Sequence, residues 1–173
     1  NEMMSRSTHF VGQAAPPIDG RTLGGELFML ADHVGQKMIV LNFFTTWCEP
    51  CRREMPELID YARNHPDSVL VVGVDVGEDP RIVAAFVEEL GIPFPVVLDP
   101  NHEISRLYGV VSFPTTVVVN LDGSIGLYEV GMIRNAGVTF NPLLELNRLI
   151  AAQGNAVSRE NYLNAAQTSF RPE

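Results

Sequence analysis

The feature that most constrains the fold is an apolar run that leads directly into the only two cysteines of the chain. Residues 37–44 read Lys-Met-Ile-Val-Leu-Asn-Phe-Phe, which predicts a buried strand. Residues 52–64 then place apolar side chains on one face of a helix, and Pro50 suits the first turn of that helix because no N–H is needed there. Cys48 and Cys51 therefore lie where a strand ends and a helix begins.

This position favours thiol chemistry. Free N–H groups and the positive end of the helix dipole stabilise a thiolate, so we expect Cys48 to have a lowered pKa and to act as nucleophile. Cys51, one turn further along, can reach Cys48 and close a small disulfide ring. The carboxylate of Glu49 opposes a second negative charge. We therefore expect Cys48 to be only moderately acidic, which suits a reductant better than a strong oxidant.

The cysteine pair has two other interpretations, a structural disulfide and half of a zinc site. A disulfide that closes so short a loop removes little entropy from the unfolded chain. Zinc needs three or four protein ligands, whereas the chain has no second cysteine pair and its four histidines are scattered, at His9, His33, His65 and His102. A Cys-x-x-Cys beside alternating strands and helices is typical of a redox motif. We expect a redox-active disulfide, no metal and no other cofactor.

Length and charge limit the class of protein. The 173 residues, 46% of them hydrophobic, suffice for one domain with a good core. A net charge of −9 argues against nonspecific binding to nucleic acid. No apolar run of the sequence approaches the roughly 20 residues of a membrane-spanning helix. Residues 1–4 look like the cut edge of a longer chain, so we expect an upstream signal or anchor to have been removed.

Strands and helices alternate along the rest of the chain. Residues 1–9 are polar and predicted to be loose, and Gly24-Gly25 before residues 26–30 predicts an N-terminal hairpin. The Val-rich residues 68–76 predict a strand buried on both faces. The segments that follow predict a helix at 81–90, a strand at 96–98 and a hairpin that pairs 115–119 with 125–130.

The C-terminal part is predicted to hold one helix and an appendage. Asn141 caps the helix, Gly154 ends it, and its inward face consists of Leu143, Leu144, Leu146, Leu149 and Ile150. We divide the chain into a flexible N-terminus at 1–9, one domain at 10–154 and a polar appendage at 155–173. The alternation predicts an α/β fold with a central mixed sheet and helices on both faces.

Four stretches of the chain resemble the thioredoxin fold, and more narrowly the extracytoplasmic TlpA/ResA-like thiol-disulfide oxidoreductases. They are residues 41–56 with their Cys-Glu-Pro-Cys, 74–78, 93–99 and 113–116. The similarity extends over residues 11–133 in the order that the family has. The resemblance implies a thioredoxin-like domain with an N-terminal hairpin extension.

The resemblance also assigns roles to individual residues. It implies that Cys48 attacks a client disulfide, that Cys51 resolves the product, and that Pro114 is a cis-proline facing the disulfide. A cis X–Pro bond is a minority state, and an ordinary proline at the start of a strand is the alternative. Trp47 and Phe113 are expected to shape the substrate site.

A buried acid is the third role that the resemblance implies. Thioredoxins proper place an Asp six residues before the first cysteine, where this chain has Asn42. ResA-like proteins use a Glu near the end of the following strand, which matches Glu78. Apolar surroundings would raise the pKa of Glu78 and let it accept the proton of Cys51. The alternative is that Glu78 merely caps the next helix. Glu54 and Asp75 are interpreted as structural and lie outside the expected site.

The expected function is reduction of protein disulfides outside the cytoplasm, with apocytochrome c as one client that the resemblance suggests. A membrane thiol-transfer protein would rereduce the pair, and we expect a monomer. Two alternatives stay open. A peroxiredoxin-like peroxidase would need a Thr near a cysteine without a partner two residues on. A copper-delivery module of related fold would space its cysteines three apart and add a distal His, whereas two residues separate the cysteines here.

Overall fold

A seven-stranded mixed sheet forms the centre of the computed structural model, which describes the backbone of residues 2–152 and 159–169 and the side chains of 6–152 and 159–167. The strands follow the order β2-β1-β5-β4-β3-β6-β7. They are β1 (Asp19–Thr22), β2 (Leu27–Met29), β3 (Met38–Phe44), β4 (Val69–Val76), β5 (Val96–Asp99), β6 (Thr115–Val119) and β7 (Ile125–Val130). β3, β4 and β5 are parallel, and the other neighbouring pairs are antiparallel. The predicted mixed sheet and N-terminal hairpin are confirmed.

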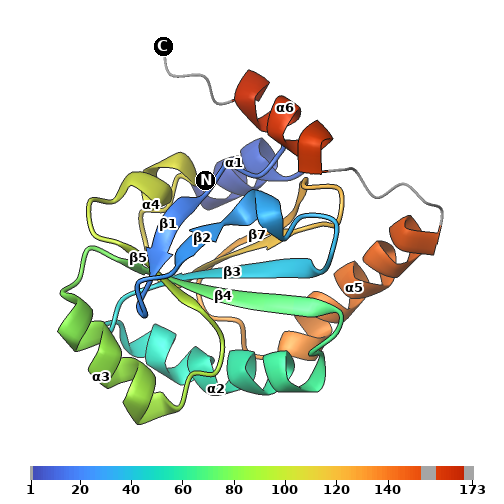
Figure 1. Cartoon of the computed structure of the whole chain (residues 1–173). Coiled ribbons are helices and arrows are strands. Elements are labelled where there is room, and N and C mark those ends of the chain that lie inside the picture. The colour runs from blue at the N-terminus through green and yellow to red at the C-terminus, as the bar shows by residue number, and fades with distance from the viewer. Residues whose placement is uncertain (1, 153–158, 170–173) are drawn as a thin grey trace.

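Helices cover both faces of this sheet (Figure 1). They are α1 (Glu2–Phe10), the short 3₁₀ helix η1 (Leu30–Asp32), α2 (Glu49–Asn64), α3 (Pro80–Leu90), α4 (Glu103–Leu107), α5 (Ala136–Ala152) and α6 (Arg159–Ser169). α2, α3 and α5 pack on one face, whereas α1, α4 and α6 pack on the other. None of the helices in the described residues has both the length and the apolar character to cross a membrane.

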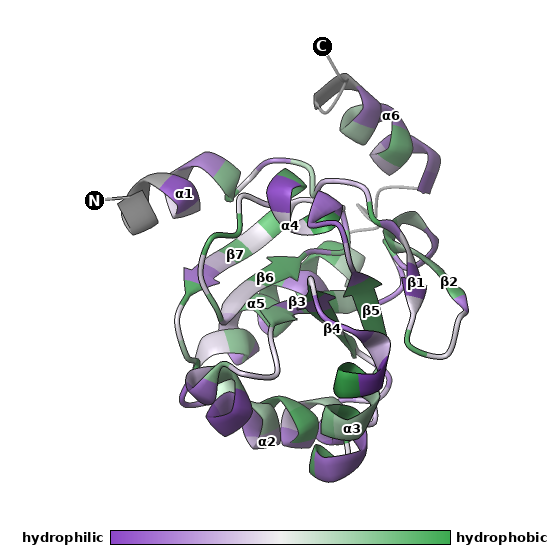
Figure 2. Ribbon diagram, turned by 90° about the vertical axis from the view of Figure 1, so that its left-hand side faces the viewer, coloured by the Kyte–Doolittle hydropathy of each residue, from purple (hydrophilic) through white to green (hydrophobic). Residues whose placement is uncertain are grey.

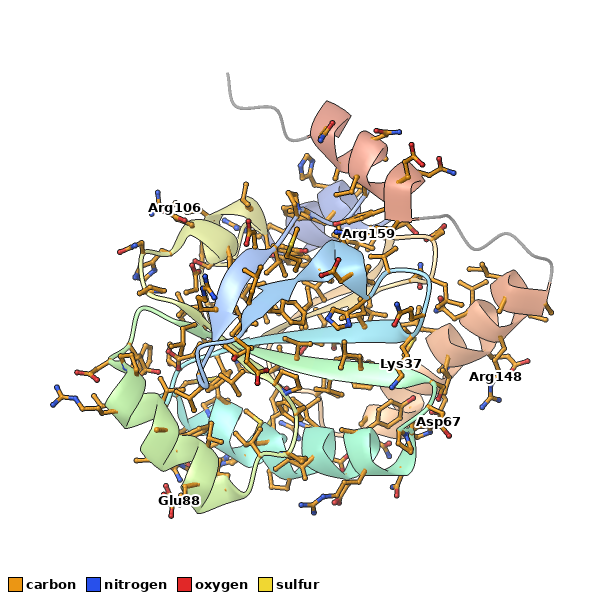
Figure 3. The ribbon with its side chains drawn as sticks, in the orientation of Figure 1. Lys37, Asp67, Glu88, Arg106, Arg148 and Arg159 are labelled. Carbon is orange, nitrogen blue, oxygen red and sulfur yellow. A yellow bond between two sulfur atoms is a disulfide. The ribbon has the colours of Figure 1, made fainter. Side chains whose placement is uncertain are left out.

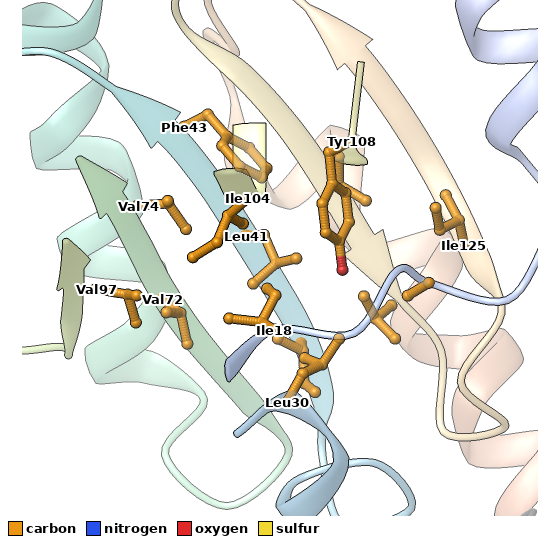
Figure 4. Close-up of a cluster of buried hydrophobic side chains, with 14 of the residues drawn as sticks. Ile18, Leu30, Leu41, Phe43, Val72, Val74, Val97, Ile104, Tyr108 and Ile125 are labelled. Carbon is orange, nitrogen blue, oxygen red and sulfur yellow. The ribbon is translucent and has the colours of Figure 1, made fainter. Parts of the chain in front are cut away.

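Each face of the sheet has its own hydrophobic core. All seven residues of β3 are buried, and successive side chains of a strand point to opposite faces. Leu41 and Phe43 enter the core that α1, α4 and α6 cover, part of which is drawn in Figure 4, and Val40 and Phe44 enter the core beneath α2 and α3. Figure 2 shows the resulting layers, with hydrophobic residues along strands such as β5 and β6 and hydrophilic and hydrophobic residues alternating along helices such as α2. β3 is thus held from both sides up to the residues that precede the cysteines.

The N-terminal segment differs from its prediction, because residues expected to be loose form α1. Phe10 at the end of α1 is buried and stacks on Tyr128, with ring centroids 4.9 Å apart. The guanidinium of Arg6 donates to the carbonyl oxygen of Gly109, which lies 103 residues further along the chain. The polar sequence of residues 1–9 could not predict this helix, because the residues that hold it, Gly109 and Tyr128, are distant in the sequence.

α5 begins earlier than predicted and presents a different face to the core. The carboxylate of Glu57 accepts a hydrogen bond from the N–H of Ala136 at 3.0 Å, which supports the helix start from a neighbouring element. The predicted inward residues Leu146 and Leu149 are 45% and 53% exposed. The buried face consists of Ala136, Phe140, Leu144 and Asn147. The predicted helix end at Gly154 lies outside the described residues.

The predicted C-terminal appendage is in part a helix packed on the domain. Residues 155–158 and 170–173 lie outside the described part, but α6 inserts Tyr162, which is 1% exposed and donates to the carbonyl oxygen of Ala15 at 2.5 Å. Arg159 pairs with Asp32 of η1 at 2.8 Å, and Figure 3 shows its side chain at the junction of α6 with the body. Gly123 permits the approach of the Tyr162 ring, because a Cβ there would lie 2.5 Å from Cδ2 of the ring. These contacts hold α6 against the body of the protein.

Candidate active site

The end of β3 and the start of α2 position the two cysteines. Cys48 is the residue that caps the N-terminus of α2, and the N–H of Cys51 donates to its Sγ atom at 3.3 Å. The two residues form a disulfide with their Cα atoms 5.3 Å apart. Cys48 is 5% exposed and Cys51 is fully buried. Only the Cys48 sulfur can therefore be approached from solvent without moving the backbone.

The loop before β6 covers the disulfide. The bond between Phe113 and Pro114 is cis, as the resemblance implied. The carbonyl oxygen of Phe113 lies 3.5 Å from Sγ of Cys48, and the carbonyl oxygen of Pro114 accepts a hydrogen bond from the N–H of Gly131 at 2.8 Å. This loop is therefore fixed to β7 on one side and faces the disulfide on the other.

Two aromatic rings border the approach to Cys48. Trp47 is 73% exposed, and its ring meets the half-buried ring of Phe113 edge-on, with centroids 6.2 Å apart. Val111, two residues before Phe113, is 68% exposed. Apolar groups left in water at this position are the kind of surface that contacts a polypeptide or another apolar partner.

Glu78 lies beside the segment that leads into Cys48, but its ionisation differs from the prediction. One carboxylate oxygen accepts from the N–H of Thr46 at 2.7 Å and the other from its hydroxyl at 2.6 Å. Burial by itself would raise the pKa of Glu78, but hydrogen bonds from Asp75 and Thr46 outweigh it and lower the pKa below its usual value. The expected raised pKa is wrong. Nor does Glu78 cap the next helix, since Asp79 does so by accepting from the N–H of Arg81.

Glu54 is a buried acid that the sequence interpretation left out of the site. It lies one turn after Cys51 on α2 and is fully buried. Its two oxygens accept from the side-chain amide of Asn42 at 2.7 Å and from the N–H of Ile133 at 2.6 Å. Burial outweighs both hydrogen bonds and raises the pKa of Glu54 to about 7. The sequence did contain a signal for this role: an acid lies three residues after Cys51, and Asn42, which cannot titrate, stands where thioredoxins have their buried Asp.

Asp75 is the second buried acid that was left out. It interrupts the otherwise apolar strand β4, is 1% exposed, and neighbours Phe44 of β3 in the sheet register. Burial, reinforced by the nearby carboxyl of Glu78, raises the pKa of Asp75 to about 9. The sequence could have indicated a buried acid here, because Asp75 is the single acid within a strand predicted to be buried on both faces. Among the described residues, no group of three or more His, Cys, Asp or Glu side chains could hold a metal ion.

Comparison with known proteins agrees with this geometry. The AhpC/TSA family model matches residues 11–127. The chain is 37% identical to the thioredoxin-like protein YneN of Bacillus subtilis over 69% of this chain and 71% of that protein. It is also 37% identical to the thiol-disulfide oxidoreductase ResA of Geobacillus thermodenitrificans, over 66% of each chain.

Solved structures agree with the fold. A thiol:disulfide interchange protein from Chlorobium tepidum superposes with a TM-score of 0.69 at 27% identity, covering 79% of this chain and 96% of that one. StoA from Bacillus subtilis superposes with a TM-score of 0.62 at 27% identity, covering 76% and 96%. The chain belongs to the AhpC/TSA family and, within it, to the thioredoxin-fold thiol-disulfide oxidoreductases that resemble ResA.

Proposed function

We propose that this protein reduces the disulfides of polypeptide clients outside the cytoplasm by exchange at Cys48 and Cys51. The observation that carries the proposal is the disulfide at the N-terminus of α2 beside the cis-proline loop, of which Cys48 alone is partly exposed, at 5%. The exposed aromatic rim of Trp47 and Phe113 suits a polypeptide better than a small polar molecule. The helix N-terminus favours the thiolate form of Cys48 in the reduced protein.

The exchange has two balanced steps. The Cys48 thiolate attacks one sulfur of the client disulfide, so that a mixed disulfide forms and the other client sulfur leaves as a thiolate and takes up a proton. Cys51 then loses its proton and attacks the Cys48 sulfur, which releases the second client sulfur as a thiolate that is protonated in turn. The client gains two electrons and two protons, and the protein ends with its own disulfide.

Glu54 is better placed than Glu78 to receive the proton of Cys51. It lies one turn from Cys51 on the same buried face, and its pKa of about 7 matches a group that exchanges protons at neutral pH. Glu78 binds Thr46 through both oxygens and has a lowered pKa. We therefore assign Glu54 to proton transfer and Glu78 to holding the turn before Cys48.

The electron donor and the client follow from the same chemistry. A reductant that ends each cycle oxidised must be rereduced by another dithiol, and a membrane thiol-transfer protein would supply one outside the cytoplasm. The client that we propose first is apocytochrome c, whose Cys-x-x-Cys-His segment must be reduced before haem attachment. A protein of this family acting in that way would work as a monomer on one client at a time.

The reduction potential of the Cys48–Cys51 pair tests the proposal. We would equilibrate the protein in redox buffers and then offer the reduced form an oxidised Cys-x-x-Cys-His peptide. A potential nearer to the roughly −270 mV of thioredoxin than to the roughly −120 mV of DsbA, with stoichiometric reduction of the peptide, supports a reductase. A potential near the DsbA end would make the protein an oxidant and contradict the proposal. Peroxide consumption or tight Cu(I) retention without a reversible couple would favour the peroxidase or the copper module instead.

A further inference from the structure

Asp75 is a buried carboxyl group with too few donors for a charged form. It is 1% exposed, and neither of its oxygens has a hydrogen bond of good geometry from a described residue. The backbone N–H of Glu78 favours the charged form, but burial and the neighbouring Glu78 carboxyl outweigh it. An ionised carboxylate in such a place would lose its hydration with little compensation, which is costly in a protein interior. A neutral carboxylic acid avoids that penalty and gains a proton that it can donate.

The acceptor for that proton is Glu78. The carboxyl groups of Asp75 and Glu78 lie within hydrogen-bonding reach of each other, and two carboxyl groups can share a hydrogen bond only if one of them is protonated. Glu78 already receives two hydrogen bonds from Thr46, which stabilise its charged form. The proton therefore belongs on Asp75, and the charge on Glu78.

The surroundings of Asp75 contain no buried cation among the described residues. Asp75 points to the face of the sheet that carries α2 and α3, because its register neighbour Phe44 packs there. Besides apolar groups and Tyr61, α2 buries Cys51 and Glu54 on this side, and α3 buries only apolar groups. Asp99 of the adjacent strand β5 adds another acid, which accepts from the N–H groups of Ile104 and Ser105. Of the surrounding groups, Asp99 adds to burial and to the Glu78 carboxyl in raising the pKa of Asp75, which favours the neutral acid.

We propose that Asp75 is a positioning residue for disulfide exchange, which as a neutral acid donates to Glu78 and keeps that carboxylate bound to Thr46, two residues before Cys48. The inference rests on the proposed function. It adds that one buried proton, on Asp75, stabilises the turn before Cys48 through Glu78 and Thr46. The raised pKa of Asp75, to about 9, agrees with this arrangement. When the proton leaves in alkaline solution, two adjacent charges repel each other beneath the turn and the grip of Glu78 on Thr46 weakens.

The pair is also linked to the redox state. A thiolate at Cys48 in the reduced protein lies two residues from Thr46, which Glu78 binds, and its negative charge makes loss of the proton that Asp75 and Glu78 share less favourable. The proton affinity of the pair then differs between the oxidised and reduced protein. By linkage, the reduction potential must change its slope against pH in the alkaline range where Asp75 titrates.

Two measurements test this inference on the intact protein. The first is a pH titration of the aspartate carboxyl carbons by ¹³C NMR in oxidised and reduced protein. We expect one carbon to titrate on the alkaline side of neutrality, at a higher pH in the reduced form, and to be missing in Asp75→Asn. The second is the reduction potential of Cys48–Cys51 against pH. We expect an alkaline change of slope in the wild type that is lost in Asp75→Asn, whose amide can donate but cannot titrate.

Asp99→Asn is the matched control, because it neutralises a buried acid on the adjacent strand that does not hold Thr46. It should keep the alkaline change of slope. If Asp75→Asn fails to fold, the alkaline titration of a carboxyl carbon in the wild type still detects the buried proton. Glu78→Gln then assigns that titration to Asp75, because removing the neighbouring charge should move it to lower pH.

Titration of every aspartate in the acid range, or an unchanged potential profile in Asp75→Asn, would overturn the inference while leaving the proposed function intact. Absence of any reversible couple in the wild type would overturn the proposed function, and the positioning role with it, whatever the carbon titration shows.

Discussion

Cys48 and Cys51 differ in access although only two residues separate them. Cys51 is fully buried, whereas Cys48 is 5% exposed under the carbonyl oxygen of Phe113. In the proposed exchange, the client therefore bonds to Cys48, and its release depends on Cys51.

We predict that Cys51→Ala converts turnover into a trapped intermediate. Incubated in reduced form with a peptide that contains an internal disulfide, this variant should hold the peptide in a mixed disulfide at Cys48, visible by mass spectrometry without reductant. Cys48→Ala is the matched control and should trap nothing. Equal trapping by both variants would show that Cys51 is also open to clients.

Glu54 makes the stability of the protein depend on pH. Its pKa is about 7 in the folded protein and 4.5 when unperturbed, so the folded state binds the proton more tightly. Its contribution is fully present below the unperturbed value and is lost as pH rises through about 7. The difference between these two pKa values corresponds to about 3 kcal/mol.

We predict that Glu54→Gln flattens the dependence of the unfolding free energy on pH between these two values. Relative to the wild type, the variant should gain stability as pH rises, because a neutral amide carries no buried charge. Urea unfolding at several pH values measures this, with the exposed Asp60→Asn on the same helix as control. A parallel pH dependence in Glu54→Gln and the wild type would show that Glu54 is ionised at no cost.

The disulfide and the cis-proline could be predicted from the sequence, but the charge states around them could not. Cys48, Cys51 and Pro114 are marked by a local motif and by family resemblance. The lowered pKa of Glu78 depends on Thr46 and Asp75, which come from two other segments of the chain. Whether a carboxyl is held charged or neutral is decided by which donors reach it, and a linear pattern does not contain that information.

At the scale of elements, those with a strong local pattern were predicted well. β3, β4 and α3 have apolar periodicities that match their final burial. The prediction was poor for α1, α5 and α6, because contacts with other elements position these helices. The contacts are Arg6 with Gly109, Glu57 with Ala136, and Tyr162 with Ala15. Tertiary packing outweighs propensity in such segments.

We predict that α6 contributes measurably to the stability of the domain. Tyr162→Ala should lower the unfolding free energy by about 3–5 kcal/mol, as expected for a large buried aromatic side chain. Tyr162→Phe should lower it by roughly 1 kcal/mol, since it removes only the hydrogen bond to Ala15. Denaturant unfolding measures both, with the exposed Gln167→Ala as control. An unchanged midpoint in Tyr162→Ala would mean that α6 folds independently of the sheet.

The whole molecule carries a net charge of −9. Charged side chains such as Glu88, Arg106 and Arg148 project outward around the body in Figure 3. Arg52 and Arg53, which follow the motif, pair with Glu89 at 2.9 Å and with Glu49 at 3.3 Å. The net charge of the whole molecule therefore favours the approach of cationic partners.

We predict that the reduced protein reacts faster with a cationic disulfide than with an anionic one. Cystamine and dithiodipropionate form a matched pair of small probes of opposite charge, and stopped-flow kinetics at low salt should separate their rate constants. Added salt should bring the two rate constants closer together, because it screens the field over about 10 Å at 0.1 M. Equal rates at low salt would show that steering by net charge is absent.

Trp47 gives the protein a fluorescence signal close to its disulfide. It is the only tryptophan of the sequence, it adjoins Cys48, and it is 73% exposed in a T-shaped contact with Phe113. Disulfides quench indole emission by accepting an excited electron, whereas thiols do so weakly. The intrinsic fluorescence of this protein should therefore brighten when the pair is reduced and shift colour when a client covers the ring. The emission of Trp47 would therefore report both the redox state of the cysteine pair and the binding of a client, without an attached label.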